Sequence, residues 1–184
     1  ILGSLMSISF IEVLGILAVI ASVMSYFYQV YLIYKTRARK ENDIWVKSLF
    51  FAFFTLAIAL IESVIYLLGA SQAWIISAGW FLMTGFVGFL ITSHLYKIIP
   101  FLVWFERYAP LVGKQKVPML NDMIPLREAN AQMYVSATGV MMVGVALLVQ
   151  SSTLFNAGVS ILVVGAIFLL VSVYAMMQYG KEVL

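Results

Sequence analysis

The stretch Ser48-Leu-Phe-Phe-Ala-Phe-Phe-Thr-Leu-Ala-Ile-Ala-Leu-Ile-Glu-Ser-Val-Ile-Tyr-Leu-Leu68 decides the fold. Across this stretch Glu62 is the only residue with a charged side chain. An α-helix needs about 20 predominantly apolar residues to cross the hydrocarbon core of a bilayer, where its backbone polar groups must be hydrogen-bonded within the segment. The stretch therefore predicts a membrane-spanning helix.

Four more stretches of the same kind lie on either side of it. Together they predict five spans, at about residues 8–34, 45–69, 73–97, 131–150 and 154–179. The chain of 184 residues is 64% hydrophobic and only 10% charged, against about a quarter charged in an ordinary soluble domain. We therefore expect residues 1–184 to form one all-α bundle embedded in a membrane.

The linkers between the spans alternate in charge. Those near residues 69–73 and 150–156 carry no charge, and all 11 Lys and Arg residues fall on the other side of a five-span chain. The positive-inside rule then predicts that the N-terminus is outside, that the C-terminus is inside and that residues 98–130 form a cytoplasmic loop. This topology accounts for the net charge of +3, so the lipid bilayer is the expected partner and nucleic acid is not.

Two carboxylates lie in or near the predicted hydrocarbon region, Glu12 and Glu62. A charge inside a span is costly, so Glu62 is a functional candidate: it is expected to be neutral or to face a wet cavity. One interpretation is a proton or ion relay, to which Glu12 could contribute. The alternatives are a protonated Glu62 that bonds a neighbouring helix and a Glu12 that is simply solvated at the outer interface.

His94 is the only histidine, and the chain has no cysteine. Disulfides and thiolate metal sites are thereby excluded, and a haem or metal normally needs more than one strong ligand. His94 is therefore a candidate polar or ligand site, with interhelical hydrogen bonding as the alternative. We predict no metal site within the chain. No catalytic residue is assigned, because phosphate-binding loops, zinc-protease motifs and serine-nucleophile elbows are missing from the sequence.

The segment after His94 mixes aromatic and charged residues with Pro100 at a membrane edge. Proline lacks a backbone donor, so Pro100 is expected to kink or end the third helix, with the next residues along the membrane surface. Further on, the apolar residues of 117–124 are too many for a solvated linker. We expect a folded loop that packs on the bundle or on another subunit.

Weak similarity also relates the two halves of the chain. A shift of 80 residues aligns Leu67-Leu68 with Leu147-Leu148 and Gly85 with Gly165. This pattern suggests a duplicated hairpin, although apolar helices also resemble one another by chance.

The run His94-Leu-Tyr-Lys-Ile-Ile-Pro-Phe-Leu-Val-Trp-Phe-Glu-Arg-Tyr108, followed by Gly113-Lys-Gln-Lys-Val-Pro-Met-Leu-Asn-Asp-Met123, resembles the C-terminal region of a bacterial membrane family similar to subunit I of haem-copper oxidases. The resemblance covers residues 73–128. It implies a longer protein whose diagnostic histidines lie upstream, so that any haem would be bound through residues outside this chain. His94 is not assigned as a ligand on this basis.

Three functions follow as hypotheses. The first is a segment or subunit of a respiratory, haem-copper-oxidase-like assembly that supports electron or proton transfer, with upstream helices or other membrane subunits as partners. The second is a small transporter or channel for a proton, ion or small solute. The third is a structural subunit that docks a partner through its loop. The bacterial inner (cytoplasmic) membrane is the expected location, and the start at Ile1 suggests that a leader or further helices precede it.

Overall fold

The computed structural model describes residues 9–36 and 43–181 of the chain. Within them it is all-helical, and five helices are long and apolar enough to cross a membrane. The chain is thus an integral membrane protein, as the sequence predicts. The described residues fall into two units: helix α2 (Ser9–Thr36) belongs to one, and all later elements form the other.

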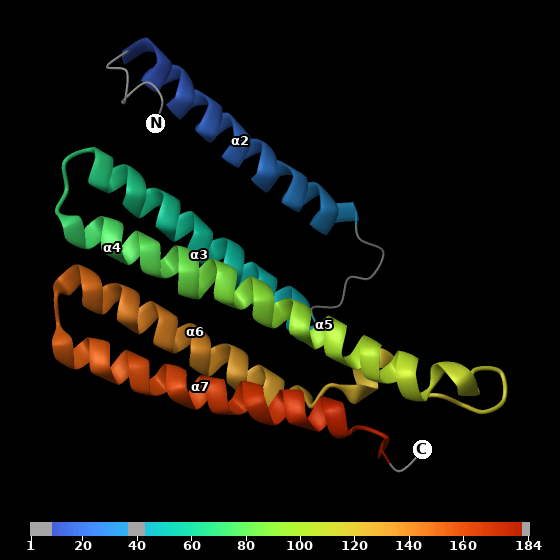
Figure 1. The fold of residues 1–184 in the computed structure, drawn as a ribbon. Helices are drawn as coiled ribbons and strands as arrows, with labels where there is room; N and C mark the ends of the chain where they lie inside the picture. Colours follow the sequence, from blue (N-terminus) through green and yellow to red (C-terminus); the bar gives the residue numbers. More distant parts are fainter. Residues whose placement is uncertain (1–8, 37–42, 182–184) are drawn as a thin grey trace. The chain divides into compact units, whose positions relative to one another are not determined.

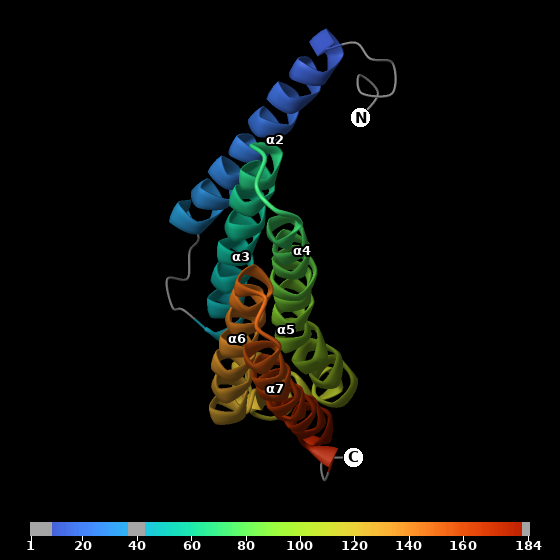
Figure 2. The same ribbon diagram turned by 90° about the vertical axis from the view of Figure 1, so that its left-hand side faces the viewer.

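The second unit consists of two helical hairpins (Figures 1 and 2). The first pairs α3 (Ile44–Leu67) with a long helix made of α4 (Gln72–Trp80), the π-helix η1 (Phe81–Val87) and α5 (Gly88–Arg107). The second pairs α6 (Leu126–Val149) with α7 (Ser152–Gln178). Short 3-10 segments, η2 (Ala109–Leu111) and η3 (Leu120–Met123), lie between the hairpins.

Both hairpins turn at the same end of the unit, which Figure 1 shows at the left. The backbone reverses through Gly69, with φ of 100°, and through Gln150, with φ of 52°. Both values lie in the left-handed region that ends helices. We call this end the turn end, and the opposite end, which carries residues 108–125, the loop end. The short turns fall in the two uncharged linkers identified in the sequence.

Small residues allow the helices to approach closely. A Cβ atom placed on Gly85 would lie 2.6 Å from Thr55 Cβ, and one placed on Gly165 would lie 2.2 Å from Ser136 Oγ. In each hairpin, therefore, a glycine of the second helix packs on a hydroxyl residue of the first. The 80-residue shift aligns the two glycines but places Thr55 on Val135, one residue before Ser136, and the suggested duplication stays a prediction.

Large apolar side chains on the outer faces remain exposed, among them Met83, Val163 and Leu170. Such faces suit contact with lipid tails, whereas small and polar residues concentrate between the helices. Candidate functional side chains of the second unit are therefore expected between its helices.

The third span is longer than the sequence predicts. The helix from Gln72 to Arg107 has 36 residues, or about 54 Å at 1.5 Å per residue, whereas a prediction based on hydropathy ends it near residue 97. Pro100 therefore does not end the helix, and that alternative is wrong. Whether Pro100 bends α5, and whether the residues after it lie along the membrane surface, stay predictions. The helix survives because Pro100 is fully buried and the turns after it are anchored to the loop and to α7, as described below.

Candidate functional site

Glu62 lies on the inner face of α3 and is only 5% exposed. Residues spaced three or four apart share a helix face, and those on this face are small or polar: Ser48, Ala52, Thr55 and Ala59, all buried. Glu62 precedes the end of α3 at Leu67 by five residues, which places it about 7.5 Å along the helix from the turn end. Its carboxyl group is therefore held between helices in the third of the unit nearest the turns.

The neighbours of this carboxyl group come from α4 and α6. The side chain of Ser77 lies beside it, and the Ser77 hydroxyl donates a hydrogen bond of 3.2 Å to the carbonyl oxygen of Gly144. Within the described part of the chain, Glu62 Oε2 is buried without a hydrogen-bond partner. One oxygen of the group is thus free to take a proton or to face a ligand.

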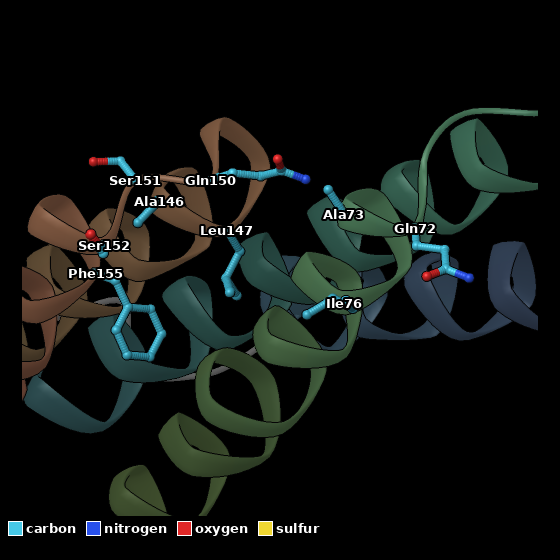
Figure 3. A pocket seen from close by; sticks show the side chains of 9 residues that line it. All are labelled: Gln72, Ala73, Ile76, Ala146, Leu147, Gln150, Ser151, Ser152 and Phe155. Carbon is cyan, nitrogen blue, oxygen red and sulfur yellow. The ribbon is translucent and has the colours of Figure 1, made fainter.

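A hollow lies at the turn end, where α4 meets the α6–α7 turn (Figure 3). Its lining combines polar and apolar side chains from both hairpins: Gln72, Ala73, Ile76, Ala146, Leu147, Gln150, Ser151, Ser152 and Phe155. Ala73 is one helical turn from Ser77, and Ala146 is two residues from Gly144. The hollow therefore lies directly above the level of Glu62.

One apolar layer lies directly below Glu62. Phe81 and Val140 are buried, and a Cβ atom on Gly144 would lie 2.2 Å from Phe81 Cζ, so the Phe81 ring rests on the backbone of α6. Trp80 Nε1 donates a hydrogen bond of 3.0 Å to the carbonyl oxygen of Val140. This layer coincides with the start of the π-helix, a distortion that is frequent at functional sites.

A second polar cluster lies between this layer and the loop end. The Tyr96 hydroxyl donates a hydrogen bond of 3.3 Å to Gln132 Oε1, and Gln132 Nε2 donates one of 3.2 Å to Ser136 Oγ. Ser172 of α7 lies beside the Tyr96 hydroxyl. All four side chains are buried. The hydrogen-bonded chain joins α5 to α6, and Ser172 Oγ of α7 lies beside it without a hydrogen-bond partner among the described residues.

His94 is not part of either cluster. It lies on an exposed face of α5, with Nδ1 2.7 Å from the carbonyl oxygen of Leu90 and its ring edge-on to Trp45. Nearby, Lys97 forms an ion pair of 2.8 Å with Asp43, the N-cap of α3. The searched part of the chain holds no group of three or more His, Cys, Asp or Glu side chains that could bind a metal. Nothing in the structure tests His94 as a ligand, and the candidacy stays a prediction.

Glu12 falls in α2, but its side chain lies outside the described part of the chain. The relay that the sequence suggested between Glu12 and Glu62 is therefore untested.

The loop-end segment packs on the chain itself. Trp104 Nε1 donates a hydrogen bond of 2.9 Å to the carbonyl oxygen of Pro118, and Met123 is buried beside Val103 and Tyr108. The guanidinium group of Arg107 donates to the carbonyl oxygens of Met177 and Tyr179 at the end of α7. Cationic side chains commonly satisfy the free carbonyls at helix C-termini. The sequence left open whether this loop packs on the bundle or on another subunit. Packing on the bundle is present in the structure.

Several residues of these sites escape a reading of the sequence. Tyr96, Gln132 and Arg107 look like ordinary interfacial or loop residues until the helices are assembled. The small-residue face of α3 was detectable, because Ser48, Ala52, Thr55, Ala59 and Glu62 follow helical spacing.

Comparisons with known protein families, with curated proteins and with solved structures find no match for this chain.

Proposed function

We propose that this multi-span membrane protein transfers protons through Glu62. The observation that supports the proposal is the buried carboxyl group, whose Oε2 has no hydrogen-bond partner in the described part of the chain. An ionisable group inside a membrane bundle is expensive and normally serves a path for protons or ions. A role in folding alone would favour a carboxyl group with both oxygens satisfied.

A proton suits this site better than a metal cation. A cation that gives up its water shell requires a ring of several oxygen ligands. The side chain of Ser77 lies beside Glu62, and its hydroxyl is already bonded to the carbonyl oxygen of Gly144. The searched part of the chain holds no group of three or more His, Cys, Asp or Glu side chains that could bind a metal ion. A single carboxylate oxygen, by contrast, is enough to accept and release a proton.

The cluster of Tyr96, Gln132, Ser136 and Ser172 extends the path toward the loop end. Hydroxyl and amide groups in a hydrogen-bonded chain can pass a proton on when water or a rearranged side chain joins them. The apolar layer at Phe81 separates this chain from Glu62, so transfer between them is gated. A gated path of this kind is typical of a transporter or of the proton-conducting part of a larger enzyme.

The experiment is proton flux into liposomes that contain the purified protein, measured with an enclosed pH-sensitive dye under an imposed membrane potential. Glu62→Gln preserves shape and removes the titrating group, so flux should fall to that of protein-free liposomes. Glu62→Asp keeps a carboxyl group and should retain part of the flux. Glu106→Gln, which neutralises an exposed carboxylate on α5, is the control and should leave flux unchanged. Wild-type flux in Glu62→Gln would refute the proposal.

A respiratory assembly related to the haem-copper oxidases is the second candidate, and the proton path would then serve a larger enzyme. Its support is the resemblance of residues 73–128. The described residues hold no group of three or more His, Cys, Asp or Glu side chains that could bind a metal ion, and no step of the proposed transfer passes through haem or copper. A reduced-minus-oxidised absorption spectrum of protein from its native membrane, combined with its intact mass, tests this setting. Haem bands and a mass well above 20.5 kDa would support it, and a featureless spectrum at that mass would oppose it.

A docking role for the loop is the third candidate. Met123 and Ile124 are buried within the chain, but Met119 is 77% exposed. Replacement of residues 117–124 by a Gly/Ser linker should release a partner subunit in a pull-down, and retention of every partner would count against docking.

A further inference from the structure

The hollow at the turn end and the Glu62 site both lie along the contact between α4 and α6, which we call the seam. On α4, Ala73 borders the hollow and Ser77 follows one turn deeper on the same face. On α6, Ala146 borders the hollow and Gly144 accepts the hydrogen bond from Ser77. Glu62 reaches this level from α3 and lies beside Ser77. Hollow, small-residue floor and buried carboxyl group thus follow one another along the seam.

The residues along the seam differ in a way that suits the passage of water. The lining of the hollow carries amide and hydroxyl groups from Gln72, Gln150, Ser151 and Ser152, together with the apolar side chains of Ile76, Leu147 and Phe155. Ala73 and Ala146 are its buried members, at 8% and 2% exposed, and form its floor. Polar rims hold water, and small floor residues leave the shortest barrier to the group beneath them. In the other direction the Phe81 ring closes on Gly144, and about 27 Å of α3, from Glu62 to Ile44, separates the carboxyl group from the loop end.

We propose that this hollow is the entrance through which protons from the aqueous phase at the turn end reach Glu62. In the step, a hydronium ion at the entrance transfers a proton to the Glu62 carboxylate, which becomes a neutral carboxylic acid and leaves a water molecule behind, and the reverse step returns the proton to the same side. Phe81 keeps the loop end out of contact with the carboxyl group while the entrance is open. This inference rests on the proposed function and adds the side from which Glu62 is loaded. The positive-inside rule places that side outside the cell.

The chain has no cysteine, so single cysteines can be introduced into the otherwise native protein. Ala73→Cys and Ala146→Cys place a thiol at the floor of the hollow. Ala78→Cys is the matched control: Ala78 lies on the same helix as Ala73 and is similarly buried, at 3% against 8% exposed, but does not line the hollow. A small membrane-impermeant thiol reagent added at the turn end should modify the two floor cysteines and leave Ala78→Cys unmodified.

A second readout reports on Glu62 without requiring transport. A water-soluble carbodiimide with a small amine should convert the Glu62 carboxyl group to an amide, detected by peptide mass. Prior attachment of a bulky maleimide to Ala73→Cys or Ala146→Cys should prevent this conversion, whereas treatment of Ala78→Cys with the same maleimide should not. Unreactive floor cysteines, or conversion of Glu62 despite the attached maleimide, would overturn the inference. Neither result depends on flux, so a failed entrance and a failed proton-transfer function are distinguishable.

Discussion

Gly165→Ala is a sharp test of how α6 and α7 meet. A Cβ atom on Gly165 would lie 2.2 Å from Ser136 Oγ and 3.2 Å from both Ser136 Cα and Cβ. Rotation of the Ser136 side chain can relieve only the first of these contacts, because the Cα atom belongs to the backbone of α6. The two helices must therefore separate, or Ser136 must give up its place as acceptor for Gln132.

Two opposing terms determine how much Gly165→Ala changes the free energy of unfolding. Overpacking a tight contact costs about 1–3 kcal/mol, and replacing glycine by alanine within a helix returns up to about 1 kcal/mol. We expect a net loss of about 1–2 kcal/mol in the free energy of unfolding. Gly79→Ala is the matched control, since a Cβ atom there would meet nothing within 4 Å, and it should be neutral or slightly stabilising. The two variants should thus differ by about 2 kcal/mol, roughly a 30-fold change in the ratio of folded to unfolded protein.

The assay is reversible unfolding in mixed micelles by titration with SDS, followed by circular dichroism. Ser136→Ala in the Gly165→Ala background removes the closest clashing atom, so the double variant should show a favourable coupling energy of at least about 0.5 kcal/mol. Equal stabilities for Gly165→Ala and Gly79→Ala would refute the close approach of α6 and α7 at this level, and with it the placement of Ser136 in the inner cluster.

Three further predictions concern the loop end. Arg107→Lys removes the planar guanidinium group that donates to two carbonyl oxygens at the end of α7. The free energy of unfolding should therefore fall by about 1–3 kcal/mol, and amide exchange at the end of α7 should be faster. Unchanged exchange would contradict this contact. Trp104→Phe removes the hydrogen bond to Pro118 at a cost of about 0.5–1.5 kcal/mol, and limited proteolysis should cut the loop sooner. Lys97 and Asp43 form a partly exposed ion pair, with side chains 42% and 21% exposed, so a double-mutant cycle with Lys97→Met and Asp43→Asn should give a coupling energy below about 1 kcal/mol. A larger value would mean that the pair is shielded from solvent.

The sequence alone determined the class and the span count. Hydropathy identifies the helices well because a membrane admits only segments that satisfy their own backbone, so long apolar runs have few alternatives. It was least accurate at Pro100, where the helix continues to Arg107. The loss of one backbone hydrogen bond there is offset by contacts with residues far along the chain, and hydropathy carries no information about those.

Only part of the candidate site could be predicted from the sequence. Glu62 could be identified from the sequence because a carboxyl group in an apolar run is conspicuous wherever the helix packs. Its surroundings could not, because Ser77 and Gly144 are ordinary helix residues whose approach depends on how α3, α4 and α6 are assembled. The same holds for Tyr96 and Gln132, which lie 36 residues apart in the chain and share a hydrogen bond. Periodicity fixes which residues share one helix face, whereas the pairing of faces depends on the fit of small residues between helices, and tertiary structure alone decided it.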